Sequence, residues 1–101
     1  MPRYLVFTKY SATGIAGLRA EGYQARQVTA TKAIESLGGT VESFLWMDQS
    51  DADFAAVLVM PSFDALMGML SIARASGAFD RTTFSEVLDG ESMDRAAAGC
   101  A

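Results

Sequence analysis

Three acidic residues, Asp48, Asp51 and Asp53, lie within one polar stretch between two apolar runs and could hold a divalent cation. Hard cations need several carboxylate oxygens that converge on one point. The stretch lacks the spacing, the glycine and the distal glutamate of an EF-hand loop, and Asp is also a common turn residue. We therefore favour a plain turn over a metal site, and no metal ligand is expected.

Asp53 is the best single candidate in this stretch, because it stands where the chain re-enters an apolar run. It is a candidate ligand-binding residue. Its structural alternative is to accept hydrogen bonds from backbone N–H groups at the start of a strand, or to pair with an arginine.

Arg26 is a second candidate for chemistry. Continued from Ile15 at helical periodicity, it falls within the apolar stripe of a predicted helix. A cation held there could bind a carboxylate or enolate oxygen of a ligand. If Gly22 and Tyr23 reset the helical phase, Arg26 instead lies on the surface, and we favour this second interpretation.

Aromatic residues at strand spacing suggest a wall for a small apolar ligand, or simply packing at an interface. They are Tyr4, Tyr10, Phe44 and Trp46, the only tryptophan. Lys9, beside Tyr10 and near a strand end, could polarise a ligand oxygen or could be an ordinary solvated lysine. The candidate ligand-binding residues are therefore Lys9, Tyr10, Arg26, Trp46 and Asp53.

The composition narrows the classes of function. A chain of 101 residues with 50% hydrophobic and 20% charged residues predicts one globular domain. A net charge of -4 with eight scattered Lys and Arg residues argues against nucleic acid as a partner. No apolar stretch reaches membrane-spanning length and no signal peptide is recognisable, so a cytoplasmic protein without a membrane partner is expected.

Cysteine and histidine usage narrows the chemistry further. The chain has no histidine, which removes the usual neutral-pH base, a common metal ligand and any His-ligated haem, and no cofactor is expected. Cys100, the only cysteine, stands next to the C-terminus and is interpreted as a bystander. No pair of nucleophile and base is visible.

The elements that must position these residues follow from periodicity. Strands are predicted at 4–10, 40–47, 54–61 and 81–88, and helices at 15–37 and 63–77. Ser11 or Thr13 can cap the first helix, Gly22 and Tyr23 can kink it, and Ser62 can cap the second helix. Residues 1–88 then form the domain, and residues 89–101 are expected to be a loose, aperiodic tail.

The order βαββαβ predicts an α+β fold, a ferredoxin-like sandwich in which a four-stranded antiparallel sheet carries two helices on one face. The first and third strands are apolar on both sides, although the two helices can cover only one face. A second copy of the chain is the simplest cover, which predicts a homodimer or higher homo-oligomer as a dimeric α+β barrel. A monomer with residual surface hydrophobicity is the alternative.

Several segments together resemble the GYD domain family. They are Tyr4 to Tyr10 with Gly14, Ala33 to Gly39, the aromatic strand that ends in Trp46, Phe54 to Pro61, and Arg81 to Thr83. The resemblance covers residues 1–88 and implies a ferredoxin-like, dimeric α/β-barrel fold, but no particular reaction. The Gly-Tyr-Asp signature of the family falls on Asp51-Ala52-Asp53, so only the aspartate is kept.

Two classes of function remain. In the first, a small dimeric protein binds a small molecule or serves as an interaction module. In the second, by analogy with other proteins of the dimeric α/β-barrel architecture, a cofactor-independent oxidoreductase or isomerase acts on a small, partly aromatic or apolar substrate. There Arg26 or Lys9 would stabilise oxyanion charge.

Overall fold

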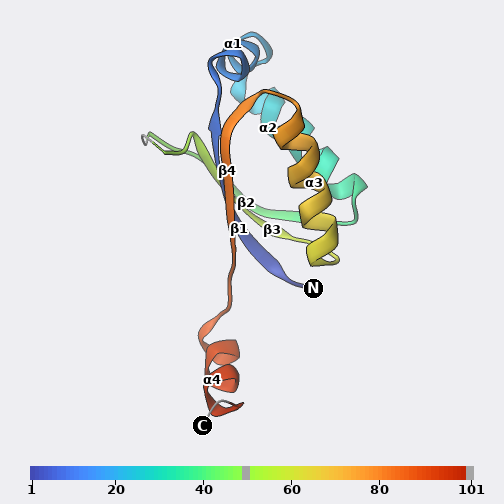
Figure 1. Cartoon of the computed structure of the whole chain (residues 1–101), viewed down its shortest axis with the longest axis vertical. Helices are drawn as coiled ribbons and strands as arrows, with labels where there is room; N and C mark the ends of the chain where they lie inside the picture. The colour runs from blue at the N-terminus through green and yellow to red at the C-terminus, as the bar shows by residue number, and fades with distance from the viewer. Residues whose placement is uncertain (49–50, 100–101) are drawn as a thin grey trace.

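Strand β1 (Arg3–Tyr10) lies inside a four-stranded antiparallel sheet, between β3 (Phe54–Val59) and β4 (Phe79–Glu86). Strand β2 (Thr40–Trp46) completes the sheet beside β3. The computed structural model describes residues 1–48 and 51–99. Its strand order β2-β3-β1-β4 confirms the predicted ferredoxin-like α+β fold (Figure 1). Strand β4 begins two residues before its predicted start.

The helices α1 (Ala12–Glu21), α2 (Tyr23–Ser36) and α3 (Phe63–Ala75) form the helical layer, with α2 and α3 beside the sheet (Figure 1). The prediction of one helix over 15–37 was wrong, because Gly22 adopts a φ of 98°, which L side chains rarely adopt. Its N–H donates to the carbonyl oxygen of Leu18 at 2.8 Å and closes α1. No helix in the described part of the chain is long and apolar enough to cross a membrane.

Serine side chains cap the N-termini of two of these helices, as predicted from the sequence. Ser11 rather than Thr13 caps α1, since its Oγ accepts a hydrogen bond from the N–H of Gly14 at 3.0 Å. Ser62 caps α3 in the same way, with the N–H of Ala65 as donor at 3.1 Å. These caps fix where the chain turns from the sheet into the helical layer.

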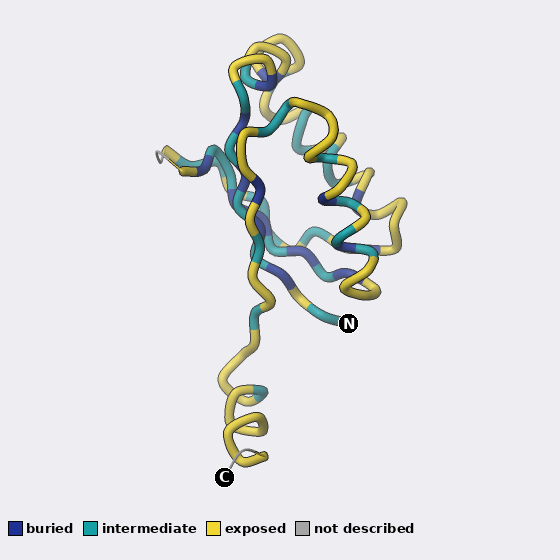
Figure 2. Tube along the Cα trace, viewed as in Figure 1, coloured by how far each residue is buried: buried dark blue, intermediate teal, exposed yellow. Residues whose placement is uncertain are grey.

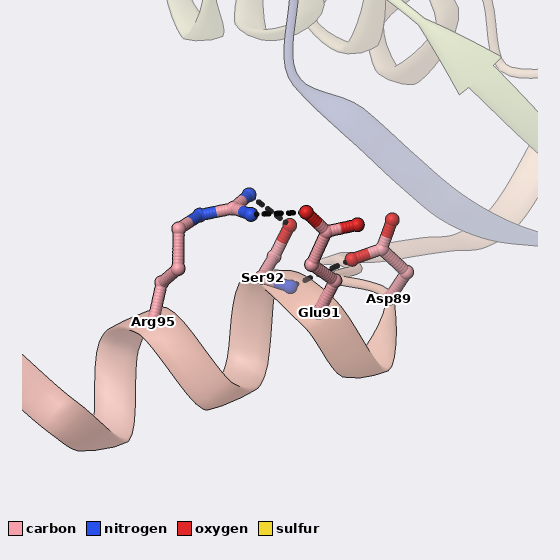
Figure 3. A network of polar contacts seen from close by, with 4 residues as sticks. All are labelled: Asp89, Glu91, Ser92 and Arg95. Carbon is pink, nitrogen blue, oxygen red and sulfur yellow. Dashed lines mark hydrogen bonds and ion pairs between the residues drawn. The ribbon is translucent and has the colours of Figure 1, made fainter.

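The residues after β4 form a helix, α4 (Gly90–Gly99), which projects away from the sheet (Figure 1). Asp89 caps it: its Oδ1 accepts the N–H of Ser92 at 2.8 Å, and this hydrogen bond holds the pKa of the Asp89 carboxyl below its ordinary value. Arg95 then donates to Glu91 and to Ser92, each at 3.0 Å (Figure 3). The prediction of an aperiodic tail at 89–101 was therefore wrong over α4, and Cys100 lies outside the described residues.

The hydrophobic core lies between the helical layer and the sheet, where the buried positions of Figure 2 gather. Alternation along β1 sends one set of side chains into it. From the helices come Ile34 of α2 and Leu66 and Leu70 of α3. The sheet contributes Tyr4, Val6, Ala56 and Leu58, and Met60 follows β3.

The opposite face of the sheet carries a second set of apolar side chains. Leu5, Phe7, Val57 and Val59 point away from the helical layer and are half-buried by their neighbours on the sheet. Leu45 of β2 lies on the same side and is 64% exposed. We call these five residues the bare sheet face, because no helix of the described chain packs on it (Figure 1).

Gly14 and Gly17 of α1 offer a matched pair for testing this packing. A Cβ at Gly14 would overlap the carbonyl oxygen of Ala78, whereas a Cβ at Gly17 would meet nothing within 4 Å. We expect Gly14→Ala to lower the free energy of unfolding by about 1–3 kcal/mol through overpacking. Gly17→Ala should raise it by about 0.5–1 kcal/mol. Urea denaturation of both variants measures this, and equal effects would contradict the close contact of α1 with the chain before β4.

Candidate functional site

A cavity of about 550 Å³ lies between the sheet and the helical layer. Such a volume is within the range of small-molecule sites. Its lining is predominantly apolar and comes from both layers. Prominent members are Val6, Leu18, Phe44, Phe54 and Leu70. The two rings among them, Phe44 and Phe54, stack with centroids 4.4 Å apart and form part of the wall.

Three hydroxyl side chains lie on the otherwise apolar floor of this cavity. Thr8 of β1 and Thr82 of β4 are directly opposite each other in the sheet, and Tyr10 is the next residue of β1 on the same face. Tyr10 is 5% exposed and Thr82 8% exposed. Neither Tyr10 Oη nor Thr82 Oγ1 has a hydrogen-bond partner among the described residues. Buried polar atoms without a partner are uncommon and costly, so these two call for an explanation.

Arg26 brings a positive charge to the same cavity. Its backbone N–H donates to the carbonyl oxygen of Gly22 at 2.9 Å, which places it in the first turn of α2. Its side chain is half-buried and lines the cavity. Within residues 1–48 and 51–99 it makes no ion pair. The break at Gly22 does reset the helical phase, yet Arg26 still faces the cavity rather than open solvent.

The Tyr10 hydroxyl and Arg26 influence each other. Burial raises the pKa of the Tyr10 hydroxyl above its ordinary value of 10.0, and the nearby Arg26 guanidinium opposes that rise. The carboxylates of Asp53 and Glu21 add smaller increases. The guanidinium is thus close to the hydroxyl, although no hydrogen bond of good geometry joins them. Tyr10 therefore stays protonated at neutral pH and can donate a hydrogen bond.

Trp46 supports Tyr10 from beside the cavity rather than lining it. The two rings stack with centroids 6.4 Å apart, and the ring of Tyr23 meets Trp46 edge-on at 4.8 Å. Phe54 also contacts Trp46 edge-on, at 5.3 Å. The aromatic wall suggested by the sequence thus includes Tyr10 and Phe44 at the cavity, with Trp46 packed behind.

Lys9 and Asp53 are brought together with each other, but not with the cavity. Lys9 Nζ lies 3.3 Å from Asp53 Oδ1, and the backbone N–H of Tyr10 donates to Asp53 Oδ2 at 2.8 Å. The N–H of Asp53 in turn donates to the carbonyl oxygen of Thr8 at 2.7 Å. Asp53 thus holds backbone where the inner strand β1 ends and β3 begins, the structural alternative predicted for it, with Lys9 in place of an arginine.

Asp48 and Asp51 are the other acidic residues of the turn that could contribute to a metal site. Asp51 Oδ1 lies 3.4 Å from the guanidinium of Arg81, and Asp51 is exposed. No three His, Cys, Asp or Glu side chains of the described residues gather in a way that could hold a metal ion. Ala52, at the position of the signature tyrosine, is buried.

The threonines of the cavity floor were missed by sequence reasoning. Thr8 stands at the same parity as Tyr4, Val6 and Tyr10 in β1, so the alternation along that strand could have placed it on the helix side. Its partner Thr82 could not be found in this way, since the register of β4 against β1 comes only from the folded sheet.

Tyr10→Phe tests whether the hydroxyl lacks a partner. Removing a buried polar atom that makes no hydrogen bond should leave the free energy of unfolding unchanged or raise it by about 1 kcal/mol. Tyr23→Phe is the control, because Tyr23 is 49% exposed. Urea denaturation of refolded protein at pH 7 gives both values. A loss of stability in Tyr10→Phe alone would show that the hydroxyl has a partner in the folded chain.

The same variant has a pH signature. A raised pKa in the folded state means that the stability linked to Tyr10 is complete below pH 10.0 and is lost as the pH rises from there through the folded-state pKa. The decline of stability above pH 10.0 should therefore be shallower in Tyr10→Phe than in the parent protein.

No curated protein matches the chain. The family model of the GYD domain matches residues 4–97, nearly the whole chain, and extends past β4 into α4. The chain belongs to the GYD domain family.

Proposed function

We propose that this protein binds a small organic molecule in the cavity between the sheet and the helical layer. One observation carries the proposal: Tyr10 Oη and Thr82 Oγ1 are buried at the cavity without hydrogen-bond partners among the described residues. Because both oxygen atoms are buried from solvent, a ligand oxygen would reach them through rotation of the two side chains toward the cavity, and bonding to them would remove the cost of burying both groups. The apolar walls would bury the rest of the ligand.

Binding is favoured over catalysis by the character of the polar groups. Tyr10 has a raised pKa and holds its proton at neutral pH, so it can donate a hydrogen bond but is a poor base. The guanidinium of Arg26 is also a donor. These groups suit a site that holds a ligand oxygen, and the second class, an oxidoreductase or isomerase, has less support.

Filling the cavity tests this function. Ala30 and Ala25 both lie on α2, but Ala30 lines the cavity, whereas Ala25 is exposed and does not. Native mass spectrometry of protein purified from its own host should show a bound small molecule in the parent protein and in Ala25→Phe. Ala30→Phe should lose it, because the added ring occupies the cavity. Equal retention by both variants, or no bound molecule in any of them, would refute binding in this cavity.

We also propose that the protein is a homodimer joined through the bare sheet face. Leu5, Phe7, Val57 and Val59 form a contiguous apolar centre on that face. Ion pairs stand around it, Arg3 with Glu42 at one end and Lys9 with Asp53 at the other. An apolar centre within a charged rim is the anatomy of a protein interface. A second copy is the occupant we favour, because two-fold packing covers both identical faces at once.

Leu45 and Val28 allow a matched test of the dimer, since both are exposed apolar residues of the single chain. Leu45 lies on the bare sheet face and Val28 on α2. Sedimentation equilibrium should give twice the 10.7 kDa chain mass for the parent and for Val28→Asp. Leu45→Asp should shift the mass toward one chain, because the dimer would bury the new charge. A single-chain mass for the parent at micromolar concentration would refute the dimer.

A further inference from the structure

We infer that the ligand of this cavity is a monocarboxylate with an apolar body, its carboxylate bound at Tyr10, Thr82 and Arg26. The inference rests on the proposed function and names the class of ligand that the same site would take. It follows from which polar groups lie at the cavity, from their charge, and from the apolar character of the remaining wall.

The two hydroxyls favour a ligand group with several acceptor lone pairs. Tyr10 Oη and Thr82 Oγ1 each carry a proton to donate, and each lacks a partner among the described residues. They belong to neighbouring strands, and Thr82 is directly opposite Thr8, two residues before Tyr10. A carboxylate only accepts hydrogen bonds and has two oxygens, so it is the group that suits a site whose unpartnered hydroxyls both have a proton to donate.

The positive charge of Arg26 favours a ligand whose oxygen atoms carry a negative charge. Its side chain is half-buried, and none of the ion pairs of the described chain includes it. A guanidinium binds a carboxylate through charge-assisted hydrogen bonds, about twice as strong as neutral ones. Because the site is partly shielded from water, this interaction is less screened than one on the surface.

Among the residues that the structure describes, Glu21 is the one other charged side chain in the lining. It is exposed, and the hydroxyl of Thr29 donates to its Oε2 at 3.2 Å. Solvent therefore weakens its repulsion of a bound anion more than it weakens the attraction of the half-buried Arg26. Arg74 donates to the backbone carbonyl oxygen of Thr82 at 3.0 Å but does not line the cavity. Arg26 is thus the one cation in the lining among the described residues, which suits a monoanion better than a phosphate dianion.

The body of the ligand would lie against the apolar wall. From the helices this wall includes Leu18, Ala33 and Leu70, and the sheet adds Val6 and the stacked pair Phe44 and Phe54. None of these side chains offers a polar atom. A chain or ring of carbon atoms is therefore the complementary partner, and each buried methylene contributes about 0.8 kcal/mol.

Paired probes that differ only in the head group test the inference. Isothermal titration calorimetry is run on refolded protein with decanoate against decan-1-ol, and with 3-phenylpropanoate against 3-phenylpropan-1-ol. We expect at least one carboxylate to bind roughly tenfold or more tightly than its alcohol, as one charge-assisted contact implies. Arg26→Gln should remove that preference. Arg19→Gln is the matched control, because Arg19 is exposed on α1 and does not line the cavity.

The outcomes separate the two proposals. If an alcohol binds as tightly as its carboxylate, or if Arg26→Gln keeps the preference, the carboxylate inference is wrong and small-molecule binding still stands. If no probe binds and the host-purified protein also carries no small molecule, the proposed function itself fails. Loss of the preference in both Arg26→Gln and Arg19→Gln would show a general charge effect and would also overturn the inference.

Discussion

The alternation of side chains along β1 is the constraint on which the rest of the structure depends. This strand lies between β3 and β4, so its side chains occupy the centre of both faces of the sheet. Tyr4, Val6, Thr8 and Tyr10 face the helices and are buried, whereas the residues between them face the bare side. A one-residue slip would exchange the two sets and would place Lys9 in the cavity. The same alternation therefore creates both the cavity floor and the bare sheet face.

The helical layer does not fill the space above that floor. Its apolar contacts concentrate near Ile34, Leu66 and Leu70, which pack with Tyr4 and Val6 in the core. Around Tyr10 the chain instead breaks at Gly22, and α2 begins there with Arg26 in its first turn. A positive charge thus lies near the buried hydroxyl of Tyr10, at a cavity that Thr82 also lines. In a core that served only for packing, such groups would be apolar or hydrogen-bonded to each other.

Much of the fold could be predicted from local patterns, because strand periodicity, serine caps and glycine terminators act within a few residues of one another. What failed depended on conformation or on longer contacts. The sequence indicates a possible kink at Gly22, but only its positive φ makes it a complete break. The helix α4 was not predicted, because its small residues show no apolar periodicity, although Asp89 and Ser92 provide a cap. Of the candidate site residues, Tyr10 and Arg26 line the cavity, whereas Lys9, Trp46 and Asp53 do not. Thr82 was not a candidate, because its place depends on the register of β4, which no local pattern reveals.

The most direct test of the account is a high-resolution crystal structure of the protein purified from its own host. The account predicts density for an organic molecule in the cavity, with oxygen atoms within hydrogen-bond distance of Tyr10 Oη and Thr82 Oγ1 and its carbon body against Phe44 and Phe54. Ordered water alone on both hydroxyls, or a cavity closed by movement of α2, would contradict it, because the buried groups would then be satisfied without a ligand.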